Sequence, residues 1–213
     1  MLVGKRMSKP VITIPPEMPI TEALNLMKKE HIRRTPVVKD GKLVGIVSDK
    51  DLLNASPSPV TTLSIWEMNY LLNKVTVSQV MTANVMTVTE DTPIEQAARI
   101  MADNKIGGLP VMRDGHVIGI ITETDLFKMF LELLGARESG VRATVLIEDQ
   151  TGQLLNITRA IAGKEGNFIS FGQFSGPVLN TKLVTFKVKG LSLDEVRDAI
   201  TPIVKEIVDL RIS

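Results

Sequence analysis

The sequence contains no cysteine and only two histidines, and it has few aromatic residues. Without thiols the chain cannot form disulfides, zinc ribbons or iron–sulfur clusters, and it has no thiolate nucleophile. His31 and His116 have no second histidine or glutamate at the spacing of a zinc site, so no metal site is expected. Aromatic residues make up 4% of the chain, which is too few for base-stacking platforms.

An excess of one charge and long apolar runs are also missing. The 25 basic and 24 acidic residues give a net charge of +1, which provides no general attraction to nucleic acid. No run of about 18 apolar residues is present, and Met1 to Pro10 lacks the apolar segment of a signal peptide. We therefore expect a soluble cytoplasmic protein that binds neither nucleic acid nor membranes. With 213 residues, 44% of them hydrophobic, the chain can form one large domain or two small ones.

The common catalytic motifs are absent too. The sequence has no G-x-S-x-G elbow, no Walker loop, no G-x-G-x-x-G and no histidine near a candidate nucleophile. We therefore expect no catalytic residue, no catalytic cofactor and no enzymatic activity.

An internal repeat organises the first two thirds of the chain. A shift of 74 positions superposes Met7 on Met81 and continues without a gap to Leu52 and Leu126. The matching residues are mostly apolar or turn residues, which indicates one supersecondary unit built twice. They include Val11/Val85, Thr13/Thr87, Pro19/Pro93, Ala23/Ala97, Met27/Met101, Pro36/Pro110, Gly41/Gly115, Gly45/Gly119 and Asp51/Asp125.

Each repeat is expected to run strand, helix, strand, turn, strand, helix. Apolar residues recur at helical spacing after Pro19 and again after Pro93, which predicts an amphipathic helix in each repeat. Asp40-Gly41 and Asp114-Gly115 each separate two β-branched runs, which predicts a hairpin. We place the repeats at residues 1–56 and 77–134, with a connector at 57–76. Trp66 and Tyr70 in this connector either pack across the joint between the repeats or form an aromatic ligand box.

The pattern changes near residue 135, where a second kind of domain is expected at residues 135–213. Residues 141–148 alternate as a strand, and residues 153–162 have the pattern of a helix. The later elements are predicted as strands at 168–174 and 182–188, a helix at 193–204 and a strand at 207–212. This β-α-β-β-α-β order is the ferredoxin-like arrangement.

These residues resemble known families. The motifs Gly45-Ile-Val-Ser48-Asp-Lys-Asp51 and Gly119-Ile-Ile-Thr122-Glu-Thr-Asp125 resemble the strand ends of a CBS domain pair, or Bateman module, and the segment from about Val141 resembles an ACT domain. The order CBS-CBS-ACT is similar to the acetoin-utilisation protein B family. The resemblance implies an α+β protein: two β-α-β-β-α units about a pseudo-twofold, followed by a ferredoxin-like ACT domain.

The CBS resemblance implies two composite clefts for an adenosine-containing nucleotide. A Ser or Thr with Asp three residues later is in the first place a helix-capping arrangement. The same geometry offers backbone N–H groups to phosphate and a carboxylate to ribose hydroxyls, so capping and binding can coexist. The implied first site is Ser48, Asp51, Thr87, Ile106, Gly107 and Gly108, and the implied second site is Thr122, Asp125, Thr13, Ile32, Arg33 and Arg34.

The two repeats differ at one pair of positions, where Arg33-Arg34 corresponds to Gly107-Gly108. The arginines resemble phosphate-holding residues of CBS units or belong to a solvated turn, and the glycines allow close approach of a flat base. Residues 1–52 contain ten basic and six acidic residues, +4, and residues 77–134 contain four and eight, −4. This partition indicates either attraction between two packed lobes or subunits, or recruitment of an anion.

The segment Glu148 to Leu154 resembles the turn at which ACT domains hold small amino acids. The residues implied for such a site are Asp149, Thr151, Gly152 and Leu154. Thr151 stands where that turn usually has proline. The alternative interpretation is a tight glycine turn that leads into a helix and holds no ligand.

The leading hypothesis is a non-enzymatic regulatory homodimer. It would sense AMP, ADP, ATP, NAD or S-adenosylmethionine in the CBS clefts and act through rearrangement of the dimer and the ACT domains on an unidentified regulated protein. The alternative is an interaction and dimerisation module with empty CBS clefts, whose ACT domain senses a small amino acid.

Overall fold

The computed structural model describes residues 1–55 and 74–213. By its internal contacts the chain divides into two compact units, Met1–Leu126 and Phe127–Ser213. The division falls inside helix α5 (Glu123–Leu133), whereas the domain boundary predicted from the sequence lies between residues 134 and 135. Trp66 and Tyr70 lie outside the described residues.

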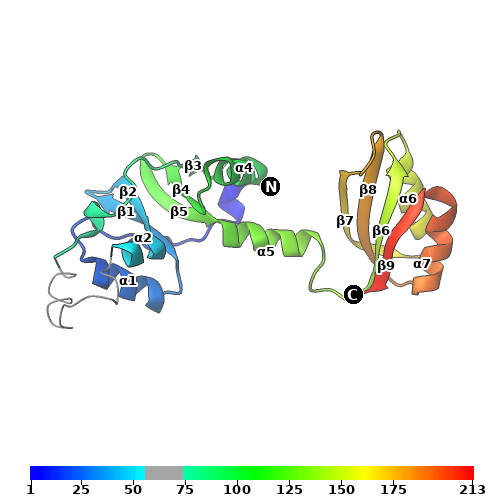
Figure 1. Ribbon diagram of the computed structural model, residues 1–213, viewed down its shortest axis with the longest axis horizontal. Coiled ribbons are helices and arrows are strands. Elements are labelled where there is room, and N and C mark those ends of the chain that lie inside the picture. The colour runs from blue at the N-terminus through cyan, green and yellow to red at the C-terminus, as the bar shows by residue number, and fades with distance from the viewer. Residues whose placement is uncertain (56–73) are drawn as a thin grey trace. The chain divides into compact units, whose positions relative to one another are not determined.

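The first unit consists of two similar halves (Figure 1). In the first half, α1 (Ile20–Lys29) is followed by the hairpin of β1 (Arg34–Lys39) and β2 (Lys42–Ser48) and then by α2 (Asp49–Asn54). In the second half, β3 (Val88–Thr89) precedes α4 (Ile94–Asn104), the hairpin of β4 (Gly108–Arg113) and β5 (His116–Thr122), and α5. Strand β3 pairs in parallel with β4, and a single parallel bridge between Ile14 and Val37 takes its place in the first half.

The local signals in the sequence account for these elements. Pro19 and Pro93 occupy the N-caps of α1 and α4, where a missing N–H costs nothing. Asp40 and Gly41 have φ angles of 49° and 75°, which are the two positive values that a type I′ hairpin turn requires. The turn between β4 and β5 has the same form, so the predicted helices and hairpins are confirmed in both repeats.

Short segments are exchanged between the two halves. The 3₁₀ helix η1 (Val3–Lys5) contributes Val3 to the core of the second repeat, together with Ala97 and Leu109. The 3₁₀ helix η2 (Val77–Gln79) contributes Val77 to the core of the first repeat. The backbone bonds are reciprocal: Val3 N donates to Thr92 O at 2.9 Å, and Val77 N donates to Met18 O at 2.9 Å. The core of each repeat is therefore completed by the segment with which the other repeat begins.

The second unit has the β-α-β-β-α-β order expected from the sequence (Figure 1). Its antiparallel sheet has the strand order β7-β8-β6-β9, which is the ferredoxin-like arrangement. Helices α6 and α7 lie on one face of this sheet. The elements are β6 (Val141–Glu148), α6 (Gln153–Ala162), β7 (Asn167–Ser175), β8 (Thr181–Lys189), α7 (Leu193–Ile200), the 3₁₀ helix η3 (Thr201–Ile203) and β9 (Glu206–Ile212).

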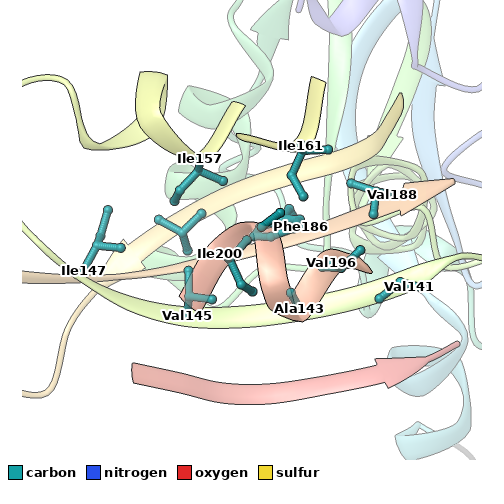
Figure 2. Close-up of a cluster of buried hydrophobic side chains, with 12 residues drawn as sticks. Val141, Ala143, Val145, Ile147, Ile157, Ile161, Phe186, Val188, Val196 and Ile200 are labelled. Atoms are coloured by element: carbon teal, nitrogen blue, oxygen red, sulfur yellow. The ribbon is translucent and has the colours of Figure 1, made fainter. Parts of the chain in front are cut away.

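The core of this unit lies between the sheet and its two helices. Figure 2 shows side chains of β6 and β8 gathered with Ile157 and Ile161 of α6 and with Val196 and Ile200 of α7. Every second residue of β6 is buried, from Val141 to Ile147, as the alternation predicts. The helix expected to reach Val204 ends at Ile200, because Pro202 has no N–H to continue the α-helical ladder.

Two features are absent from the residues that the structure describes. None of their helices is long and apolar enough to cross a membrane. Within the same part of the chain, no three acidic or histidine side chains lie close enough together to hold a metal ion.

Candidate functional site

The two terminal motifs form capping boxes at the starts of α2 and α5. The backbone N and the Oγ of Ser48 donate to Asp51 Oδ2 at 2.8 and 2.6 Å, and Asp51 N donates back to Ser48 Oγ at 3.3 Å. Thr122 and Asp125 repeat this pattern at 2.9, 2.7 and 3.4 Å. The capping arrangement read from the sequence is therefore present in both repeats.

Capping occupies only one oxygen of each carboxylate. Asp51 and Asp125 are half-buried, and in residues 1–55 and 74–213 the hydrogen bonds to both carboxylates converge on Oδ2. An ionised carboxylate has two oxygens and about four acceptor positions. The Oδ1 atoms are thus left to accept hydrogen bonds from a ligand.

A cleft of about 370 Å³ opens beside the first of these motifs. Its lining combines Ser48 and Asp51 of the first repeat with Ile106, Gly107 and Gly108 of the second. Five of the six residues implied for the first site are thus brought together. Thr87 is exposed and does not line this cleft, which is lined there by the preceding residues of the chain. The cleft is also lined by residues that were not expected at the first site: Arg34, Ile46, Thr82, Asn84, Val85, Met86, Asn104 and Lys105.

Arg34 lines this first cleft, whereas the family resemblance implied a place for it in the second site. Its Nη1 donates to the carbonyl oxygen of Gly107. A Cβ placed on Gly107 would collide with Arg34 Nη2, and a Cβ placed on Gly108 would lie 2.8 Å from Arg34 Cδ. The space that the two glycines leave, expected to admit a flat base, is occupied here by the arginine side chain of the other repeat.

The Arg34 guanidinium is half-buried, and burial lowers its pKa from the ordinary value. The negative charge of Glu123 opposes this lowering of the pKa, the positive charge of Arg33 adds to it, and Asp49 and Asp51 oppose it. Among the described residues Arg34 makes no ion pair, and its hydrogen bond goes to the neutral carbonyl of Gly107. The cleft therefore contains a cation whose partner carries no charge.

The second implied site is only partly assembled. Arg33 Nη2 donates to Thr124 Oγ1 at 2.8 Å, which joins the first repeat to the terminal motif of the second, between Thr122 and Asp125. Ile32 packs against the core of its own repeat, and Thr13 is exposed. Arg33 is thus the member of the first repeat that reaches this motif by a hydrogen bond within the described residues.

The turn of the second unit connects β6 to α6. Asp149 N donates to Asn180 O at 2.9 Å, and the Asp149 carboxylate pairs with Lys182 at 3.3 Å. Gly152, the N-cap of α6, has a φ of 90°, which favours glycine. Thr151 and Leu154 are exposed. The tight glycine turn is present, and nothing in its geometry identifies a ligand.

One signal in the sequence could have placed Arg34 correctly. Because the repeats are offset by 74 residues, Gly108 is the counterpart of Arg34, and Gly107 is the counterpart of Arg33. A large residue opposite a small one across a pseudo-twofold indicates complementary packing.

Comparisons with known proteins point to one family for the first unit. The CBS domain family matches residues 3–58 and 77–132. A CBS domain-containing protein of Dictyostelium discoideum is 35% identical over 62% of this chain and 93% of its own length. An L-aspartate semialdehyde sulfurtransferase of Methanocaldococcus jannaschii is 35% identical over 61% of this chain, but the match spans only 23% of that enzyme.

Two solved structures have the same architecture. The CBS domain pair of protein MJ0100, in complex with 5′-methylthioadenosine and S-adenosyl-L-methionine, is 34% identical with a TM-score of 0.52, over 65% of this chain and 98% of that one. A protein from Vibrio cholerae assigned to acetoin utilization (AcuB) is 30% identical with a TM-score of 0.53, over 64% of this chain and 95% of that one. Because the family match covers both repeats and more than half of the sequence, the chain belongs to the CBS domain family.

Proposed function

We propose that the chain is a non-enzymatic regulatory protein that binds an adenosine-containing ligand in the first cleft. The observation that carries this proposal is the cleft itself, which combines Ser48 and Asp51 of one repeat with residues 106–108 of the other. The CBS pair of MJ0100, similar over most of its length, was solved with two adenosine-containing ligands. A ligand bound between two repeats can favour one arrangement of them.

The lining residues suit the parts of such a ligand. The free Oδ1 of Asp51 can accept hydrogen bonds from ribose hydroxyls, while Oδ2 remains in the capping box. Ile46, Val85 and Ile106 offer apolar surface to a purine. Arg34 and Lys105 supply positive charge for an anionic group. A second ligand site at Thr122, Asp125, Thr13, Ile32 and Arg33 remains a proposal from sequence.

We further propose that the second unit is an ACT domain, that the protein is a homodimer, and that it acts on a regulated protein. The ferredoxin-like strand order supports the ACT assignment. The second candidate function is an interaction module that senses an amino acid. It remains a proposal from the resemblance of the turn between Glu148 and Leu154 to that of ACT domains.

Isothermal titration separates the two candidate functions. We expect at least one of AMP, ADP, ATP, NAD and S-adenosylmethionine to bind below millimolar concentration. Binding of none of them would contradict the nucleotide-sensing proposal. Binding of a free amino acid, with no response to any of the five, would support the second candidate.

Asp51→Asn is expected to weaken binding in the first cleft by about tenfold to a hundredfold, because the neutral side chain loses charged hydrogen bonds to the ribose. Asparagine can still accept the Ser48 N–H, so α2 keeps its cap. The measurement is isothermal titration with the ligand that binds the wild type.

A control variant shows whether breaking a capping box outside the cleft affects binding. Glu195 closes the same kind of box on α7, accepting from Ser192 N and Oγ at 2.8 Å each, at a helix that does not line the cleft. Glu195→Ala should leave nucleotide affinity unchanged. Equal affinity of Asp51→Asn and wild type would contradict the role assigned to Asp51.

A further inference from the structure

We propose that Arg34 is an exchangeable tie between the two CBS repeats, and that a phosphate group on the ligand releases it. The proposal rests on the proposed function, because it concerns the ligand of the same first cleft. It adds that phosphorylated ligands act on the arrangement of the repeats, whereas adenosine fills the cleft without doing so.

The contact between Arg34 and Gly107 joins the start of β1 to the start of β4. Arg34 is the first residue of β1, and its guanidinium donates to the carbonyl of Gly107, directly before β4. The same carbonyl accepts the backbone N–H of Glu123, the first residue of α5, at 3.1 Å. A change at Arg34 therefore acts on the acceptor that anchors the start of α5.

The present partner of Arg34 is weaker than a phosphate would be. A guanidinium bound to a neutral carbonyl makes a weaker hydrogen bond than one bound to an anion, and its planar fork can hold phosphate by two parallel bonds. Half-burial increases this difference, because less water competes for the cation. A phosphate placed within reach is thus expected to take the guanidinium from Gly107.

The charges of the cleft favour an anionic ligand. Arg34 and Lys105 are the basic residues of its described lining, and Asp51 is the acidic one. Arg34 reaches across to Gly107 because the second repeat has no side chain there. The reverse contact cannot form, since Gly108 is the counterpart of Arg34 in the second repeat. The device therefore belongs to the first cleft alone.

Titration tests the charge requirement. We expect AMP to bind the wild type roughly tenfold or more tightly than adenosine, and Arg34→Gln to reduce this preference to within about threefold while adenosine affinity is kept. Arg99→Gln is the matched control, because Arg99 is exposed on α4 and does not line the cleft. It should keep the preference for AMP.

The outcomes of this titration distinguish the two proposals. If neither adenosine nor any of AMP, ADP, ATP, NAD and S-adenosylmethionine binds, the proposed function fails and the tie fails with it. If S-adenosylmethionine or adenosine binds and AMP does not, the proposed function stands and the tie is overturned. If AMP and adenosine bind the wild type equally, the nucleoside site stands and the tie is overturned. If Arg34→Gln keeps the full preference for AMP, the tie is also overturned.

A distance measurement tests the release. Because the chain has no cysteine, Lys29→Cys and Asp103→Cys can carry a pair of spin labels at equivalent exposed positions of α1 and α4. AMP is expected to change the label-to-label distance distribution, and adenosine is expected to leave it unchanged. In the labelled protein with Arg34→Gln, AMP should produce no further change.

Gly107→Ala should imitate the released state without any ligand. Its Cβ would meet the far end of the flexible Arg34 side chain, and Gly107 does not have a left-handed φ that alanine would resist. The ligand-free distance distribution of this variant should therefore match that of the AMP-bound wild type. The release would be contradicted if AMP and adenosine gave the same distance distribution in the wild type. It would also be contradicted if ligand-free Gly107→Ala had the same distribution as the ligand-free wild type.

Discussion

Replacing Val3 with aspartate is expected to unfold the second CBS repeat, although Val3 lies at the beginning of the first repeat in the chain. The Val3 side chain is fully buried in the core that contains Ala97, Met101 and Leu109. A carboxylate there would lose its hydration without gaining a partner, which costs about 3–5 kcal/mol of unfolding free energy. Hydrogen exchange should show loss of amide protection in α4 before α1.

Val77→Asp should produce the opposite pattern, because Val77 is fully buried in the core of the first repeat with Ile20 and Met27. Protection should then be lost first in α1. Lys5→Asp is the control, since Lys5 lies in η1 but is exposed, and it should cost less than about 0.5 kcal/mol. The exchange of segments is contradicted if Val3→Asp loses protection first in α1 and Val77→Asp loses it first in α4.

The regular elements could be predicted from the sequence because each has a local cause. The Asp-Gly turns require positive φ angles that these residues tolerate, and the terminal motifs contain both partners of a capping box within four residues. The strict alternation of β6 likewise determines which residues face the helices. The same reliance on local pattern makes the predicted helix longer than α7. The apolar pattern continues to Val204, but Pro202 has no N–H to continue the helical hydrogen bonds, and the helix ends at Ile200.

The composition of the site was less predictable, because it depends on contacts between the repeats. Internal similarity shows that Val3 corresponds to Val77, but it does not show which copy of the core each one joins. The path of Arg34 depends on the missing Cβ of Gly107, which lies in the other repeat. Contacts of this kind join residues that are far apart in the sequence, so no periodic pattern along the chain predicts them.

Phe186→Ala is expected to be the most damaging single truncation in the C-terminal unit. The ring is fully buried at the centre of the cluster in Figure 2, with its centroid 5.6 Å from that of Phe168 and 6.2 Å from that of Phe171. Removing it leaves a cavity under β8 and should lower the unfolding free energy by about 3–5 kcal/mol. For a domain of this size that corresponds to a fall in midpoint temperature of at least about 12 °C.

The set of amides that lose hydrogen-exchange protection distinguishes a local cavity in the C-terminal unit from destabilisation of the whole protein. Amides of α6 and α7 should lose protection in Phe186→Ala, because both helices contribute side chains to the same cluster. Amides of α1 and α4 should keep theirs, since their buried residues belong to other clusters. Phe174→Ala is the matched control, because that ring is 48% exposed and its loss should cost less than about 1 kcal/mol. Equal destabilisation by the two phenylalanine variants would contradict the packing described for this unit.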